Sequence, residues 1–329
     1  MKVLHVIGAD LSKKTIDFAN PKGDHIKVSN DPPGYSQLME WIRKQKINIP
    51  KMMIVMEHTG LYSYRLEQFL RTKKISFSKV PAYAIKHSMG LVRGKNDKVD
   101  AIRIARYGYE KRDSMIAEAE VNKALERLQM LHSTRDHLVR TRAGMVRSVK
   151  EYRDCCGLKD NDLIMRTQLN VIKTYDREIA KLDSAIADIV ESEPTLKKNN
   201  ELLQSITAVG KVVSVATIIK TRNFTRFDDA RKFASYCGTA PFDNTSGTSI
   251  RGKSRVSKFR DKNMNKLLDL AAKSAIQYDK ELREYYLRRT AEGKSKMSTI
   301  NIVRNKILQR MFAVIKRQTP FIKDYLKSA

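Results

Sequence analysis

Cysteine is scarce in this chain of 329 residues, which has only Cys155, Cys156 and Cys237. Three thiols cannot all pair and none stands in a CxxC spacing, so the sequence argues against a disulfide framework or a zinc site and favours a reduced, cytoplasmic protein. Long apolar runs are also missing: the longest, at 52–56 and 212–219, fall short of the ~18–20 residues that span a bilayer. The first residues include no basic leader, so we expect no signal peptide and no membrane partner.

Several nucleotide- and metal-binding motifs are absent as well. The sequence contains no GxxxxGK[ST] loop, which excludes a P-loop nucleotide motor. The six histidines are scattered, and none forms an HExxH motif, so zinc hydrolysis is unsupported.

Positive charge is abundant: 64 Lys and Arg face 36 Asp and Glu, giving a formal net charge of +28. The excess lies in the first 110 residues and after residue 200, and it implies a polyanionic partner. The densest run has five cations and no acid: Arg251, Lys253, Arg255, Lys258 and Arg260. A solvated surface is the alternative, but Gly252 and Ser254 allow close backbone approach and favour phosphate contacts over a membrane-bound amphipathic helix.

The first 110 residues alternate between strand and helix patterns. The pattern predicts strands at 3–9, 15–19, 25–29, 51–56 and 75–80, and helices at 35–45, 62–72 and 98–109. Three strands joined by short turns indicate an antiparallel meander. The whole order predicts an α/β layer with a mixed sheet covered by helices.

Long helices are predicted for the middle of the chain. Apolar residues recur every seven positions from Ala124 to Tyr152, and alternate spacings of three and four run from Ile172 to Ile189. An intramolecular helical hairpin and a dimerising coiled coil fit this pattern equally well. From Leu202 onward the chain reads as mostly helical, with a helix-hairpin-helix at 202–216, in which Ala208 stands where a glycine is usual, and a loop between Gly238 and Gly252.

Four carboxylates stand out by position in the first unit. Asp10 and Glu57 each follow an apolar strand, and Asp97 and Asp100 share one face at the start of a helix. If the first and fourth strands are neighbours and the helix packs beside them, all four converge, and their repulsion calls for a cation such as Mg²⁺. Each acid alone could be a helix cap or a solvated strand end.

Ser246 is the candidate nucleophile. It precedes Gly247 in a Gly/Thr/Ser-rich segment, and the cations that follow could hold a phosphate and lower the barrier to attack by a hydroxyl. A Ser-Gly pair in a loop is also an ordinary turn.

These residues resemble the DEDD-type insertion-sequence transposases, relatives of the Piv DNA invertase that include the bridge-RNA-guided recombinases. The N-terminal matches are Ile7–Asp17, Glu57–Tyr62 and Lys95–Ala101. The C-terminal matches are Phe227–Pro241, Ser246-Gly247 and Arg251–Lys258. The segments occur in the family's order and span nearly the whole chain.

The resemblance implies a RuvC-like, RNase H-type domain at 1–112, a helical coiled-coil region at 113–198 and a mostly helical transposase domain at 199–329. It implies that Asp10, Glu57, Asp97 and Asp100 bind Mg²⁺ and that Ser246 forms a covalent phosphoserine link to DNA. It further implies donor and target DNA as substrates, a bridge RNA as guide, and a homodimer or homotetramer paired through the coiled coil.

Two other functions compete with recombination. A RuvC-like structure-specific nuclease would use metal-activated water, with Ser246 only contacting phosphate. A basic nucleic-acid-binding scaffold would use its acids as caps and would bind no metal.

Overall fold

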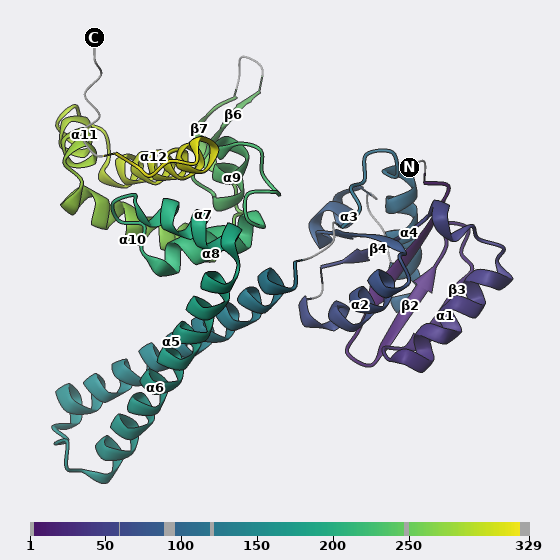
Figure 1. Ribbon diagram of the computed structural model, residues 1–329, viewed down its shortest axis with the longest axis horizontal. Coiled ribbons are helices and arrows are strands. Elements are labelled where there is room, and N and C mark those ends of the chain that lie inside the picture. The colour runs from purple at the N-terminus through teal and green to yellow at the C-terminus, as the bar shows by residue number, and fades with distance from the viewer. Residues whose placement is uncertain (1–2, 59, 89–95, 119–121, 247–249, 323–329) are drawn as a thin grey trace. The chain divides into compact units, whose positions relative to one another are not determined.

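The computed structural model describes residues 3–58, 60–88, 96–118, 122–246 and 250–322 (Figure 1). The chain divides into two compact units, Met1–Glu120 and Val121–Ala329, each with its own apolar core. The long middle helices belong to the second unit. The three-part division drawn from the sequence stays a prediction.

A five-stranded mixed sheet forms the centre of the N-terminal unit. Its strands are β1 (His5–Leu11), β2 (Thr15–Ala19), β3 (His25–Ser29), β4 (Met52–Glu57) and β5 (Ser76–Val80). The order across the sheet is β3-β2-β1-β4-β5, with β1 to β3 an antiparallel meander and β4 and β5 parallel to β1. The predicted α/β class, the meander and the mixed sheet are confirmed.

Helices cover both faces of this sheet, which explains why its central strands are apolar at nearly every position. Alternate residues of β1 and β4, such as Ile7 and Ile54, pack against α1 (Pro32–Lys44) and α2 (Tyr64–Thr72). The intervening residues, such as Val6 and Val55, face α3 (Ala82–Ser88) and α4 (Asp97–Glu110). Short 3₁₀ turns, Ile49–Lys51 and Gly60–Ser63, precede β4 and α2.

Two glycines allow α4 to lie directly on the sheet. A Cβ on Gly8 would come within 2.2 Å of the Ala101 carbonyl oxygen and 2.3 Å of the Ala105 amide nitrogen. On the helix, a Cβ on Gly108 would lie 2.7 Å from a methyl carbon of Val55. The missing side chains therefore set the distance between α4 and β1.

The second unit begins with an antiparallel helical hairpin, α5 (Lys123–Cys156) and α6 (Leu163–Ser192), which lie side by side (Figure 1). Ion pairs of 2.5 Å join Arg135 to Asp183 and Arg142 to Asp176, so the pairing runs in opposite directions along the two helices. The two helices that carry the apolar stripes of the middle region thus form an intramolecular hairpin. Pairing between protomers through the same helices stays a prediction.

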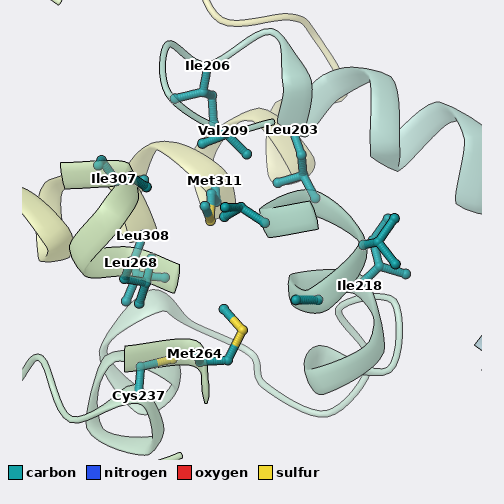
Figure 2. Close-up of a cluster of buried hydrophobic side chains, with 14 of the residues drawn as sticks. Leu203, Ile206, Val209, Ile218, Cys237, Met264, Leu268, Ile307, Leu308 and Met311 are labelled. Atoms are coloured by element: carbon teal, nitrogen blue, oxygen red, sulfur yellow. The ribbon is translucent and has the colours of Figure 1, made fainter. Parts of the chain in front are cut away.

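Six further helices and a β-hairpin follow among the described residues of the second unit. They are α7 (Pro194–Gln204), α8 (Lys211–Thr221), α9 (Ala230–Cys237), α10 (Lys262–Tyr278), α11 (Lys280–Ala291) and α12 (Lys296–Arg317). Figure 2 shows their shared core, where Leu203, Ile218, Leu268 and Met311 converge from four different helices. No helix within the described ranges is long and apolar enough to cross a membrane.

The predicted loop between Gly238 and Gly252 is wrong. This segment forms a two-stranded antiparallel hairpin of β6 (Pro241–Ser246) and β7 (Ile250–Val256). Its Gly, Ser and Thr content suggested a loop, but Thr245, Ile250 and Val256 are β-branched residues that suit paired strands. The helix α3 was also missed, because it is only seven residues long.

The contact at Gly8 gives a test of the fold. Gly8→Val should lower the melting temperature of the N-terminal unit. The free energy of unfolding should fall by about 1–3 kcal/mol or more, because backbone atoms of α4 must move. The single tryptophan, Trp41, packs against this core, so its fluorescence reports this unit.

Gly144→Ala in α5 is the matched control. A Cβ there meets no atom within 4 Å, and alanine favours a helix over glycine by about 0.5–1 kcal/mol. Gly144→Ala should leave the thermal unfolding of the N-terminal unit, followed by Trp41 fluorescence, unchanged. A Gly8→Val protein that melts like the wild type would contradict the close packing of α4 on β1.

Candidate active site

Two carboxylates stand at the same edge of the sheet because β1 and β4 are parallel neighbours. The pairing puts Ala9 opposite Met56, so the next residues along each strand, Asp10 and Glu57, lie level with each other. Both side chains are partly buried. The condition set from the sequence, that the first and fourth strands be adjacent, is met.

The start of α4 supplies two more carboxylates. Asn96 caps this helix by accepting a hydrogen bond from the Lys98 amide, and Asp97 and Asp100 occupy its first turn. Because Ala101 and Ala105 lie against Gly8, the first turn of α4 is brought beside the end of β1.

The four carboxylates interact electrostatically at Asp10. Burial is the largest cause that raises the pKa of Asp10 from its ordinary value of 3.8 to about 6, followed by the charges of Asp100, Asp97 and Glu57. Negative charge from α4 and β4 is therefore concentrated at the one acidic side chain near the end of β1. A raised pKa of this kind marks a place where a cation would be stabilised.

Basic side chains already hold two of these acids. Nη1 of Arg103 donates to Asp100 at 2.7 Å, and Nζ of Lys27 donates to Asp97 at 3.4 Å. The site thus has positive charge at its periphery, while Asp10 keeps a raised pKa.

A fifth carboxylate, Asp17, was missed by the sequence analysis. It lies directly across the β1–β2 pair from Asp10 and also raises the pKa of Asp10. The sequence signal was the tight turn between the two strands, since the register of such a hairpin determines which residues face each other.

The donor set suits a hard divalent cation, since carboxylate oxygens are the ligands that Mg²⁺ prefers. Across the described ranges, no three His, Cys, Asp or Glu side chains gather closely enough to hold one metal ion. The fit to a metal therefore depends on the oxygen donors and on the concentrated negative charge at Asp10.

Ser246 lies in the other unit, where it is the last residue of β6 and pairs with Ile250 of β7. For Ser246, Arg251 and Lys253 the structure describes the backbone only, and Gly247 lies outside the described residues. Amide groups of Asn265 and Asn301 fix the base of the hairpin by donating to backbone carbonyls of Cys237 and Thr239 at 3.0 and 2.8 Å.

The remaining residues of the basic run differ in exposure. Arg255 and Lys258 are exposed, as expected for contacts with a polyanion. Arg260 is partly buried, and its aliphatic carbons occupy the space where a Cβ of Gly238 would lie. This packing gives Arg260 a structural role beside its predicted phosphate contact.

The helix-hairpin-helix predicted at 202–216 is present as α7, a turn and α8. Ile206 and Val209 of the turn are buried, and Ala208 has the left-handed φ of 71° that explains why glycine is usual there. The N-cap of α8 is Gly210, which has no side chain to accept from the first amides of the helix. Such an N-terminus can bind a phosphate.

Comparison with known proteins gives consistent results over both units. A DEDD-type IS110 model, described as a transposase, matches residues 7–152, and a model described as the transposase IS116/IS110/IS902 family matches residues 200–287. Pilin gene-inverting proteins are similar along the whole length: that of Moraxella bovis is 27% identical and that of Moraxella lacunata 26%, each over 96% of this chain and 97% of the relative. An uncharacterised insertion element IS110 protein of Streptomyces coelicolor is 23% identical over 48% of this chain and 38% of its own.

The raised pKa of Asp10 predicts that the stability of the metal-free protein depends on pH. A carboxyl whose pKa is higher in the folded state stabilises the fold at low pH, and this contribution is lost as the pH rises through about 6. Asp10→Asn should therefore raise the melting temperature of the N-terminal unit, followed by Trp41 fluorescence, at pH 8 in EDTA. At pH 4.5 this increase in melting temperature should be smaller. We expect the free energy of unfolding at pH 8 to rise by about 1–2 kcal/mol, because solvent screening reduces the roughly 1.4 kcal/mol that each unit of pKa shift represents.

Asp113→Asn is the control, since Asp113 is exposed in the same unit. It should change neither melting temperature. An Asp10→Asn protein that is less stable than the wild type at pH 8 would contradict the concentration of negative charge around Asp10.

Proposed function

The chain belongs to the IS110/Piv-type transposase family, and from this premise we propose that it is a site-specific DNA recombinase with a serine nucleophile and a divalent-metal site. In this proposal Asp10, Glu57, Asp97 and Asp100 hold Mg²⁺, and Ser246 attacks a DNA phosphate. The N-terminal unit is then the RuvC-like domain that the resemblance implies.

The observation that supports the metal site is the raised pKa of Asp10. Burial of Asp10 is the largest cause, and acids from α4, β4 and β2 add to it, so a cation bound there would offset both the burial and the repulsion. When bound, Mg²⁺ would stabilise the negative charge that develops on a phosphate during displacement. The parallel β1–β4 pair, flanked by the antiparallel meander, also agrees with an RNase H-type sheet.

The proposed step conserves the energy of the broken bond. The bond between Oγ of Ser246 and phosphorus forms, and one P–O bond to deoxyribose breaks. The serine hydroxyl loses one proton, and the leaving deoxyribose oxygen takes up one proton, so the step balances. Because a phosphodiester is exchanged for another phosphodiester, a second DNA hydroxyl can reverse the link and join strands without an external energy source.

Nucleic-acid binding in the second unit is proposed for the β7 region and the α8 N-terminus. Arg251, Lys253, Arg255, Lys258 and Arg260 follow Ser246 in sequence and would position the phosphate that it attacks. The large net charge would also accommodate a structured guide RNA in addition to DNA, as the resemblance implies.

A structure-specific nuclease is the second candidate. The acids at Asp10 are assembled within the N-terminal unit alone, so hydrolysis by metal-activated water requires nothing from Ser246. The reaction products separate the two functions: a nuclease leaves free ends, whereas a recombinase leaves joined strands.

Ser246→Ala tests the nucleophile. With DNA substrate, Mg²⁺ and the RNA transcribed beside the gene, the wild type should form a protein–DNA adduct that survives denaturing electrophoresis, and Ser246→Ala should form none. Ser249→Ala removes a hydroxyl from the same segment and should retain the adduct. Adducts from Ser246→Ala would refute the serine mechanism, and free ends from both variants would favour the nuclease.

The exposed cations predict the salt dependence of DNA binding. Replacing Arg255 and Lys258 together by alanine should weaken binding and reduce the slope of log K against log salt by about 1.8, since each phosphate contact contributes about 0.9. Binding is measured by fluorescence anisotropy between 50 and 200 mM salt, which is roughly the range over which such contacts are resolved. The control replaces Arg177 and Lys181, exposed on α6 and both paired with Glu178. Equal slopes for the two double variants would rule out these phosphate contacts.

A further inference from the structure

Asp17 is a buried carboxylate beside the proposed metal site. Its position in β2 puts it opposite Asp10 on the same face of the sheet, and only 4% of the residue is exposed. A buried carboxylate needs cationic or hydrogen-bonding partners to remain charged.

Two residues of β3 supply those partners. Nε2 of His25 lies 2.7 Å from Oδ1 of Asp17, and Nζ of Lys27 lies 3.3 Å from Oδ2. Lys27 stands directly across the β2–β3 pair from Asp17. The two oxygens of Asp17 are therefore held by two different side chains.

Lys27 also reaches the start of α4. Its ammonium group lies 3.4 Å from Oδ2 of Asp97, whose side chain is 65% exposed. In the part of the chain that the structure describes, no hydrogen bond or ion pair engages Oδ1 of Asp97. The ammonium group of Lys27 thus connects a buried carboxylate in the sheet to an exposed carboxylate that lies 70 residues after the lysine.

We propose that Asp17 and Lys27 are positioning residues for the divalent ion: Asp17 anchors the ammonium of Lys27, and Lys27 fixes Asp97 through Oδ2 and leaves Oδ1 for the ion. This inference rests on the proposed metal site and adds to it residues outside the four acids. Carboxylates that bind metals are commonly oriented by a hydrogen bond to the other oxygen.

Charge alone gives the opposite expectation, which makes the inference testable. A cation close to the site repels a second cation, so losing Lys27 would tighten metal binding if electrostatics dominated. Lys27 is half exposed, and solvent screens its charge. Losing the partner that orients a ligand typically weakens metal affinity about 10–100-fold, which exceeds the screened repulsion.

The experiment is calorimetric titration of the full chain with Mn²⁺ and with Mg²⁺ alone. Lys27→Met should weaken binding about tenfold, the low end of the usual range, and Lys27→Arg should recover most of the loss. Lys22→Met removes an exposed lysine from the same unit and should bind as the wild type does. Asp17→Asn should weaken binding in the same direction as Lys27→Met.

Melting followed by Trp41 fluorescence in EDTA separates positioning from folding. The metal-free Lys27→Met protein should lose little stability, because Lys27 is half exposed and His25 still contacts the Asp17 carboxylate. Should Asp17→Asn fail to fold, Lys27→Met decides alone. Unchanged or tighter metal binding by Lys27→Met overturns the positioning role and leaves the four-acid site intact. A wild type that binds neither ion overturns both.

Discussion

The N-terminal unit is arranged around one constraint: it holds carboxylates that repel one another together at the end of β1. Parallel pairing of β1 with β4 brings Glu57 level with Asp10, and the missing side chain at Gly8 lets α4 bring Asp97 and Asp100 close. The fold therefore keeps a partly buried carboxyl group beside like charges at the expense of its own stability: burial first, and then those charges, raise the pKa of Asp10. Such concentrations of charge are characteristic of sites that bind a cation or act on a charged substrate.

The rest of the unit supports this arrangement. Apolar residues on both faces of the sheet fix β1 and β4 between two helical layers, so the carboxylates are presented by rigid elements. Arg103 and Lys27 compensate part of the negative charge from the periphery. The second unit contributes a separate helical core and a basic hairpin, which suits binding of a polyanion.

Much of this could be predicted from local patterns. The meander, the helices on the sheet and the four acids follow from apolar runs that end in a carboxylate or begin a helix. Asp17 was missed because its relation to Asp10 depends on strand register, which no single segment reveals. The hairpin of β6 and β7 was missed because Gly, Ser and Thr also occur in loops, and its strands are defined by pairing with each other. Local chemistry made Ser246 a candidate that an ordinary turn explained equally simply, and the family resemblance then favoured it as the nucleophile.

The pKa of Asp10, followed by ¹³C NMR of aspartate-labelled protein with and without Mg²⁺, tests the central claim most directly. The account predicts titration near pH 6 in the metal-free protein and a fall below the ordinary value once Mg²⁺ is added, because a bound cation favours the ionised form. A pKa at the ordinary value that Mg²⁺ leaves unchanged would contradict it.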